Sequence, residues 1–287
     1  MLLTFIALNS AASTALQHGG STDQRPAPAV AVAIRATQAP EIDGRDTDQA
    51  WHSAPKFTGF RQFQPKADTA ARFKTEFQAA YDARHLYVFV RMFDDHPDSI
   101  MHALSRRDVR GPSDQIKLLI DSYDDKRTGY EFAVNPDGVK RDYTIVNDGQ
   151  EDDSWNGVWD VATSIDSLGW TAEFRIPLSQ LRYTKSEAYT FGFGVWRDLE
   201  RHNERDAWPP YSTTRNGLVS QLGRLTGLSG ISTARRLEVT PYTVTRNVQR
   251  VRPTSGFERD QQVTIGGDLK LGLTPNVTLD ATINPDF

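Results

Sequence analysis

Apolar and polar residues alternate along much of the chain between residues 37 and 230. Clear examples are LYVFVRMF (86–93), WTAEFRI (170–176) and YTFGFGVW (189–196). A period of two predicts β-strands, because successive side chains of a strand point to opposite faces of its sheet. Many short strands with turn residues between them predict an all-β fold, an antiparallel, jelly-roll-like β-sandwich over residues 37–230.

Turn residues support this prediction. The sequence NPDG (135–138) separates the strand-like runs GYEFAV and VKRDYTIV, and Pro, Asp and Gly between two such runs predict a β-hairpin. Only LSQLR (178–182), directly after Pro177, indicates a helical turn.

The last part of the chain, residues 231–287, has a different pattern. Both VTIGGDLKLGL (263–273) and VTLDATI (277–283) have one apolar and one polar face. Strands of about ten residues with this division are typical of a transmembrane β-barrel. An extra hairpin of a soluble sandwich is the alternative. Because open sheet edges are not tolerated in lipid, we expect such a barrel to continue beyond residue 287.

The N-terminal residues predict export. Residues 1–18 contain a short apolar run followed by small residues, as in a secretory signal segment, and the run is too short to span a bilayer as a helix. A disordered apolar tail is the alternative. Residues 19–36 are rich in Gly, Pro and Ala and are predicted to be a linker.

Composition excludes several classes of function. The chain has 33 Lys and Arg against 37 Asp and Glu, without a basic stripe, so no nucleic-acid partner is expected. It has no cysteine, which excludes disulfides, thiolate metal sites and cysteine nucleophiles.

Two tryptophans stand four residues apart in DDSWNGVW (152–159). Trp159 begins the alternating run WDVATSI and is therefore predicted to face the core. Trp155 lies in a polar segment that is predicted to be a loop, where an aromatic side chain is a candidate for ligand contact. The alternative is a ring folded over the edge of the sandwich.

The acids beside Trp155 form the densest of three acidic clusters, and its members are Asp148, Glu151, Asp152 and Asp153. Calcium takes carboxylate and carbonyl oxygens, so this loop is a candidate site for structural calcium, with a solvated turn as the alternative. No nucleophile elbow, phosphate loop or zinc-binding histidine pair occurs, so no catalytic residue is predicted.

Four motifs in sequence order resemble family nine carbohydrate-binding modules, over about residues 37–228. They are EIDGRDTDQAWHSAP (41–55), AAYDARHLYVFVRMFDD (79–95), SDQIKLLID (113–121) and GWTAEFRIPLSQL (169–181). The acids of DSYDDKRTGYEFAVNPDG and the arginine of VWRDLERHNE are similar to a bacterial branch in which the module precedes an outer-membrane barrel of uncharacterised function. The segment GGDLKLGLTPNVTLDATINPDF looks like the start of that barrel.

This resemblance implies a sandwich that binds an oligo- or polysaccharide, and some relatives hold structural calcium. In sugar-binding members two tryptophans clamp a sugar ring. The loop tryptophans of this chain are Trp155 and Trp208, and the polar residues expected near them are Arg107, Asp114 and Arg197. The remaining tryptophans, Trp51, Trp170 and Trp196, are predicted to be core residues.

The sequence therefore predicts an exported, outer-membrane-associated protein whose sugar-binding sandwich is periplasmic or surface-facing. The segment SRRDVRGPS (105–113) has no aromatic residue where the first clamp residue is expected, which favours one alternative, a structural or gating domain without a sugar site. The other alternative is a glycoside hydrolase that acts on O-glycosyl bonds, which the resemblance implies only by association.

Overall fold

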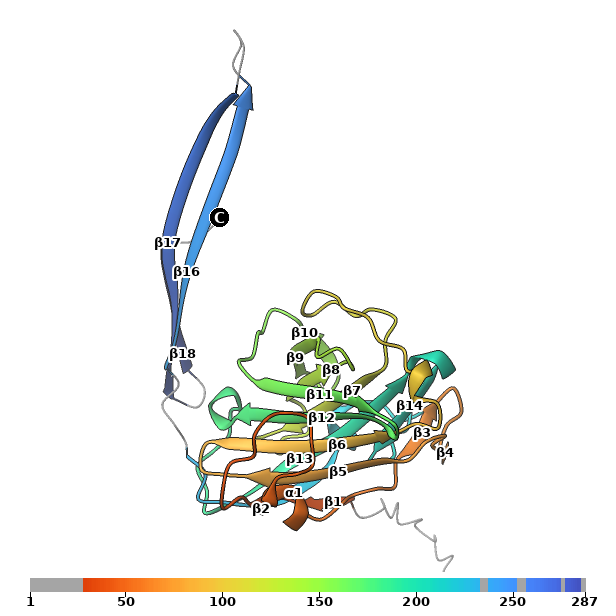
Figure 1. The fold of residues 1–287 in the computed structure, drawn as a ribbon. Helices are drawn as coiled ribbons and strands as arrows, with labels where there is room; N and C mark the ends of the chain where they lie inside the picture. Colours follow the sequence, from red (N-terminus) through yellow and green to blue (C-terminus); the bar gives the residue numbers. More distant parts are fainter. Residues whose placement is uncertain (1–27, 233–236, 252–256, 275–276, 285–287) are drawn as a thin grey trace, which may run out of the picture.

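The computed structural model describes residues 28–232, 237–251, 257–274 and 277–284. In this part of the chain two β-sheets face each other, and a sheet of three strands stands apart from them (Figure 1). The predicted all-β, sandwich-like fold is confirmed. No helix within these ranges is long and apolar enough to cross a membrane. The predicted signal segment lies outside the described residues.

The larger sheet of the sandwich has ten strands, and β13 at its centre is paired on both sides. Its main path runs through β10 (Gln150–Asp152), β9 (Lys140–Val146), β8 (Gly129–Val134), β7 (Gln115–Asp121), β13 (Ala188–Leu199), β14 (Glu204–Trp208), β3 (Arg61–Gln64) and β4 (Thr69–Ala70). The N-terminal half of β13 also pairs with β15 (Gly223–Ser229), which in turn pairs with β1 (Val30–Val32).

The smaller sheet has five strands, in the order β11 (Asp160–Asp166), β12 (Gly169–Pro177), β6 (His85–Phe93), β5 (Thr75–Tyr81) and β2 (Ile34–Arg35). Strands β8 and β9 form the predicted hairpin, and the Asn135 side chain accepts a hydrogen bond of 2.8 Å from the Val139 amide across its turn. The predicted helical turn after Pro177 is a short 3-10 helix, Leu178–Gln180. Three further 3-10 turns span Pro97–Ser99, Glu200–His202 and Val219–Gln221.

The predicted linker is wrong over its last residues. Residues 30–35 form β1 and β2, which pair in parallel with β15 and β5 and so connect the N-terminal segment to both sheets. The run VAVAIR alternates, and its alanines Ala31 and Ala33 are 0% and 3% exposed. Alternation and burial therefore outweigh the Pro- and Ala-rich composition.

The core lies between the two sheets. Trp159 and Trp170 are 1% and 0% exposed, which confirms their predicted core positions. The Trp159 ring stacks on Phe174 of β12 with a centroid distance of 5.8 Å. Aromatic burial of this size contributes strongly to the stability of a sandwich.

The smaller sheet is also covered on its outer face. The short helix α1 (Gln49–Ser53) places Trp51 over Phe89, and the Trp51 indole donates a hydrogen bond of 2.8 Å to Glu173. The Glu173 carboxylate also accepts hydrogen bonds from the backbone amides of Gly44 and Asp43, at 2.9 and 3.1 Å. Trp51 is thus buried outside the sandwich rather than between its sheets, which explains why β6 is apolar on both faces.

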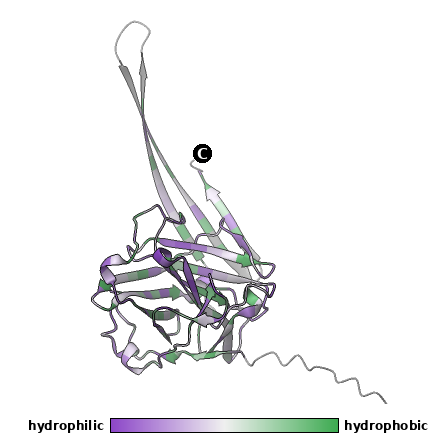
Figure 2. Cartoon of the chain, turned by 90° about the vertical axis from the view of Figure 1, so that its right-hand side faces the viewer, coloured by the Kyte–Doolittle hydropathy of each residue, from purple (hydrophilic) through white to green (hydrophobic). Residues whose placement is uncertain are grey.

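The third sheet consists of β16 (Leu237–Val251), β17 (Phe257–Thr274) and β18 (Val277–Ile283), all antiparallel. Its first two strands extend away from the sandwich and carry both hydrophobic and hydrophilic residues (Figure 2). The register places the odd-numbered residues of all three strands on one face and the even-numbered residues on the other.

Burial of Asp206 makes stability depend on pH. Burial raises the pKa of Asp206 to about 7, and the neighbouring Glu204 raises it further, although Arg197 opposes the shift. The folded state therefore keeps a proton that the unfolded chain loses above about pH 4, so the contribution of Asp206 to stability falls as the pH rises towards 7 and beyond. We expect Asp206→Asn, which cannot ionise, to lose less stability than the wild type between pH 5 and pH 8 in urea unfolding. Equal pH dependence in the two proteins would show that Asp206 is ionised in the folded state throughout.

Candidate functional site

The loop after β10 places Trp155 beside a cavity of about 440 Å³. Trp155 is half-buried, and its ring makes edge contacts with Tyr130 and Phe132 of β8 at centroid distances of 5.1 and 5.8 Å. The residue therefore closes the edge of the core and also lines the cavity. The alternative, a ring over the sandwich edge, describes this packing, and the ligand contact stays a prediction.

The other walls of the cavity combine polar and apolar residues. The polar lining residues are Ser122, Tyr123, Thr128, Thr144, Ser154, Asn156, Ser179 and Gln180, the charged ones are Asp152, Arg182 and Asp280, and Tyr130, Ile145 and Val146 add apolar surface. Hydroxyl and amide groups both donate and accept hydrogen bonds, so such walls suit a ligand rich in hydroxyl groups. The volume falls in the range of small-molecule sites, about 300–1,000 Å³.

A buried carboxylate holds the Trp155 loop in place. Asp142 of β9 accepts hydrogen bonds from the Gly157 amide, from the Trp159 indole at 3.2 Å and from the Arg107 guanidinium. The same guanidinium donates to the Gly157 carbonyl at 2.7 Å. Arg107 thus contacts the loop that carries Trp155, and its predicted contact with a ligand stays a prediction.

The other predicted ligand contacts are not at this site. Trp208 is 6% exposed and packs in the core against Phe77 at a centroid distance of 4.8 Å, so the prediction of a loop tryptophan is wrong. No clamp between Trp155 and Trp208 forms, because Trp208 is buried among core aromatic rings at the end of β14.

Asp114 and Arg197 are also buried, at 1% and 0% exposed, so the prediction that they contact a ligand is wrong. Arg197 lies between the sheets and donates to the carbonyl oxygens of Lys74 and Phe93 at 3.2 and 2.9 Å. Asp114 accepts a hydrogen bond of 2.9 Å from the Glu200 amide, and burial raises its pKa to about 6. Both residues lie near the start of β7, whereas the cavity lies near its end, about 20 Å further along the strand.

The structure does not bring the four predicted calcium ligands together. Asp148 accepts hydrogen bonds from the backbone amides of Leu218 and Ser220 at 3.1 and 2.7 Å. Glu151 accepts from Tyr143 at 2.9 Å, Asp152 accepts from Ser154 at 2.6 Å, and Asp153 is exposed. Across the described ranges no group of three or more acidic or histidine side chains is arranged to hold a metal ion. The geometry of these four residues therefore does not fit calcium.

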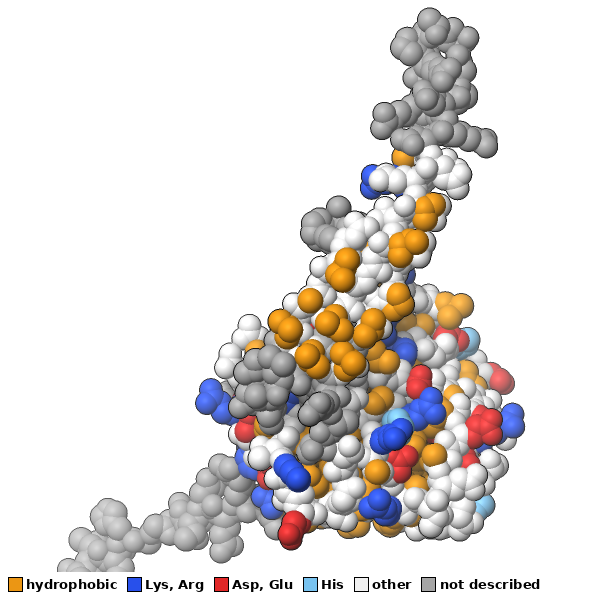
Figure 3. All heavy atoms as spheres, turned by 90° about the vertical axis from the view of Figure 1, so that its left-hand side faces the viewer, with side chains coloured by type: hydrophobic (Ala, Val, Ile, Leu, Met, Phe, Trp, Pro, Cys, Tyr) orange, Lys and Arg blue, Asp and Glu red, His pale blue; other side chains and the backbone are white. Residues whose placement is uncertain are grey.

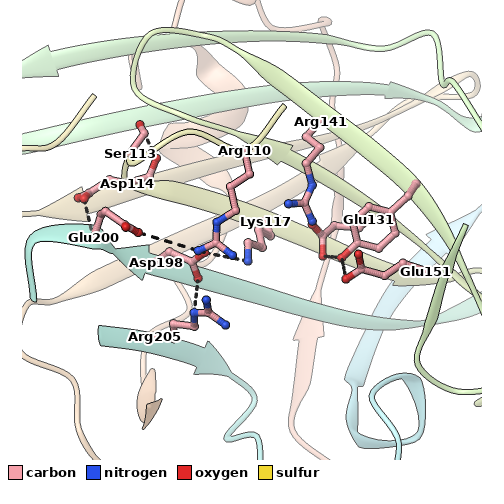
Figure 4. A network of polar contacts seen from close by, with 11 residues as sticks. Arg110, Ser113, Asp114, Lys117, Glu131, Arg141, Glu151, Asp198, Glu200 and Arg205 are labelled. Carbon is pink, nitrogen blue, oxygen red and sulfur yellow. Dashed lines mark hydrogen bonds and ion pairs between the residues drawn. The ribbon is translucent and has the colours of Figure 1, made fainter. Parts of the chain in front are cut away.

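A second polar region lies on the outer face of the ten-stranded sheet (Figure 4). Asp198 of β13 forms ion pairs with Lys117 of β7 at 2.8 Å and with Arg110 at 3.0 Å. Further along the face, Arg141 forms an ion pair of 3.3 Å with Glu131, whose other oxygen contacts the Tyr143 hydroxyl. Burial raises the pKa of Glu131, although Lys117 and Arg141 oppose the shift.

Three aromatic residues occupy the same outer face. Trp196 contacts Tyr211 and Phe63 at centroid distances of 4.7 and 4.9 Å, and both Trp196 and Tyr211 are half-buried. The predicted core position of Trp196 is therefore wrong. The alternation of β13 already contains the signal, because Phe193 and Val195 face the interior and Trp196, the next residue, must face outwards.

The position of Trp155 depends on the absence of a side chain at Gly157. A Cβ atom at Gly157 would lie 2.7 Å from the Trp155 ring, so Gly157→Ala must displace that ring. We expect a changed tryptophan emission spectrum and near-UV circular dichroism for Gly157→Ala. Gly111→Ala is the matched control, because a Cβ atom at Gly111 meets no other atom within 4 Å. Identical spectra for the two variants would contradict the described packing of Trp155.

Comparisons with known proteins agree with this architecture. The model of the carbohydrate family 9 binding domain-like family matches residues 42–216, and the model of a domain of unknown function (DUF5916) matches residues 233–287. No curated protein matches the sequence.

Two solved structures have similar folds at low sequence identity. One is a family 9 carbohydrate-binding module from Caldicellulosiruptor kristjanssonii, solved with cellotriose, with 16% identity, a TM-score of 0.51 and coverage of 71% of this chain and 96% of that one. The other is a candidate carbohydrate-binding protein from Bacteroides uniformis, with 13% identity, a TM-score of 0.53 and coverage of 70% and 99%. Since the first family model covers more than half of the residues, the chain belongs to the carbohydrate family 9 binding domain-like family.

Proposed function

We propose that the sandwich binds neutral oligosaccharides in the cavity lined by Trp155. The observation that carries this proposal is a half-buried tryptophan beside a cavity of about 440 Å³ whose walls combine apolar surface with several hydroxyl and amide groups. An indole ring offers an apolar surface to the C–H face of a sugar, while the polar walls offer partners to its hydroxyl groups. Membership of the family and the cellotriose complex of a structural relative support the same ligand class.

Preorganisation supports the same site. The Trp155 loop is fixed by the buried Asp142 and by the hydrogen bond of 3.0 Å from the Val158 amide to the Gln180 side chain. A fixed loop loses little conformational entropy when a ligand binds, which favours affinity.

The outer face of the ten-stranded sheet is a second candidate surface. Half-buried Trp196 and Tyr211 lie on the same face as the ion pairs of Asp198, so aromatic and hydrogen-bonding groups also occur together there. The aromatic rings of this group pack against one another, and Asp198 already pairs with Lys117 and Arg110. A ligand here would have to compete with these existing contacts, so the Trp155 cavity is favoured.

We also propose that the protein is exported and that β16–β18 associate with the outer membrane, leaving the sandwich in the periplasm or at the surface. Where the three strands lie side by side, one face of this sheet carries apolar residues from each of them, and Val239, Ile265 and Ile283 are 65%, 69% and 76% exposed. Hydrophobic side chains gather on the lower part of the hairpin in Figure 3. An apolar face of this kind is favourable in lipid and unfavourable in water.

Trp155→Ala tests the sugar site. We expect the wild type to bind at least one of cellotriose, xylotriose, mannotriose and maltotriose in isothermal titration calorimetry, and Trp155→Ala to lose affinity by about tenfold or more, equivalent to about 1.4 kcal/mol. The physical reason is the loss of the apolar surface beside the hydroxyl-rich walls.

Trp196→Ala is the matched control, because Trp196 is also half-buried but lies on the outer face of the sheet. It should bind as the wild type does, and circular dichroism should show that both variants are folded. Loss of binding in Trp196→Ala alone would move the site to the outer face. Binding of no trisaccharide by the wild type would favour a structural or gating role.

Lysine substitutions test the membrane proposal. Ile265 lies on the apolar face of β17 and the adjacent Thr264 lies on its polar face. We expect the full chain to float with phospholipid vesicles in a density gradient and Ile265→Lys to float less, because a lysine in the lipid-facing position costs about 2–4 kcal/mol near the bilayer midplane. Thr264→Lys should float like the wild type. Equal behaviour of the two variants would count against contact between this face and lipid.

A further inference from the structure

We infer that Asp280 of β18 is a ligand-binding residue of the Trp155 cavity, so that the sugar site is shared between the sandwich and the C-terminal sheet. This inference rests on the proposed function of the cavity. Among the described residues, Asp280 is the one lining residue that comes from the C-terminal sheet, and the others belong to the sandwich.

The register of the C-terminal sheet explains why an acid reaches the cavity. Asp280 belongs to the even-numbered face, which also carries Thr282 and Asp268, while the apolar residues Leu279 and Ile283 are on the odd-numbered face. Figure 3 looks at the molecule from the side of the hairpin and shows the hydrophobic side chains towards the viewer, with the sandwich behind. Asp280, from the even-numbered polar face, lines the cavity together with residues of the sandwich.

The chemistry of this position suits a sugar. Asp280 is exposed, and it lines the same cavity as Trp155 and the hydroxyl-bearing residues Ser154 and Thr128. A carboxylate has two acceptor oxygens and can receive hydrogen bonds from two neighbouring hydroxyl groups of one ring. Hydrogen bonds to a charged acceptor are stronger than those between neutral groups. Asp280 would thus add an anchoring group to walls that otherwise offer mainly neutral partners.

A shared site would also link the sandwich to the C-terminal sheet. A ligand that contacts Asp280 and Trp155 at once bridges the sandwich and the C-terminal sheet, so binding favours the arrangement in which the two are in contact. Occupancy of the cavity is then coupled to the position of β18, and the same coupling makes the full chain bind more tightly than a sandwich without a correctly placed β18.

Asp280→Asn in the full chain tests this inference. The substitution keeps the size of the side chain and removes its charge. With cellotriose, or with whichever trisaccharide of the panel above the wild type binds, we expect the dissociation constant to rise about tenfold. Asp268→Asn is the matched control, because Asp268 is an acid on the same polar face of the sheet that does not line the cavity. It should leave the dissociation constant unchanged.

The possible outcomes separate this inference from the proposed function. If Trp155→Ala loses binding and Asp280→Asn binds like the wild type, the sugar site stands and the role of Asp280 is disproved. If Asp268→Asn weakens binding as much as Asp280→Asn, the effect comes from the overall charge of the face, and the specific contact is disproved as well. If the wild type binds none of the trisaccharides, the function and the shared site fail together.

Discussion

The arrangement of the candidate site depends on one buried carboxylate, Asp142. Taking a charge out of water is costly unless the charge is hydrogen-bonded and paired, and Asp142 meets this requirement with donors from Arg107, Gly157 and Trp159. These donors belong to separate segments of the chain. Their hydrogen bonds to the carboxylate therefore fix the loop that follows β10 against β9 and against the segment before β7. The same contacts fix the loop that carries Trp155, whose ring packs on Tyr130 and Phe132.

Alternation predicted the strands because the sandwich has a buried face on each sheet, but it could not decide how each face is covered. Strand β6 is apolar on both faces since its outer face is buried under Trp51 of α1, a contact between segments that are far apart in the sequence. Trp208 followed by two prolines resembles a loop, yet it ends a strand whose partner residue, Val195, faces the core. The local sequence predicts the strand, whereas the burial of its side chains depends on which other segments of the chain pack against it.

Prediction of the site succeeded only where the deciding interactions are local. The loop position of Trp155 follows from the polar residues around it, and Arg107 contacts the same loop at the Gly157 carbonyl. The polar residues Asp114 and Arg197 were plausible ligands by residue type, but they lie on inward-facing or buried positions and satisfy backbone groups. The four acids near Trp155 are close in sequence and far from a common centre, because β9, β10 and the turn between them direct the side chains to different partners. Spacing in sequence therefore does not define a metal site without the fold.

The apolar and the polar face of the C-terminal sheet favour different surroundings. Apolar residues of β16–β18 such as Val239, Ile265 and Ile283 are exposed, which is unfavourable in water unless another apolar phase covers them. Asp280, on the polar face, lines the Trp155 cavity together with residues of the sandwich. Covering the apolar face with lipid and filling the cavity with a sugar would stabilise the same arrangement, because each acts on an opposite face of the same three strands. In such an arrangement, ligand binding by the sandwich would be coupled to the position of the C-terminal sheet.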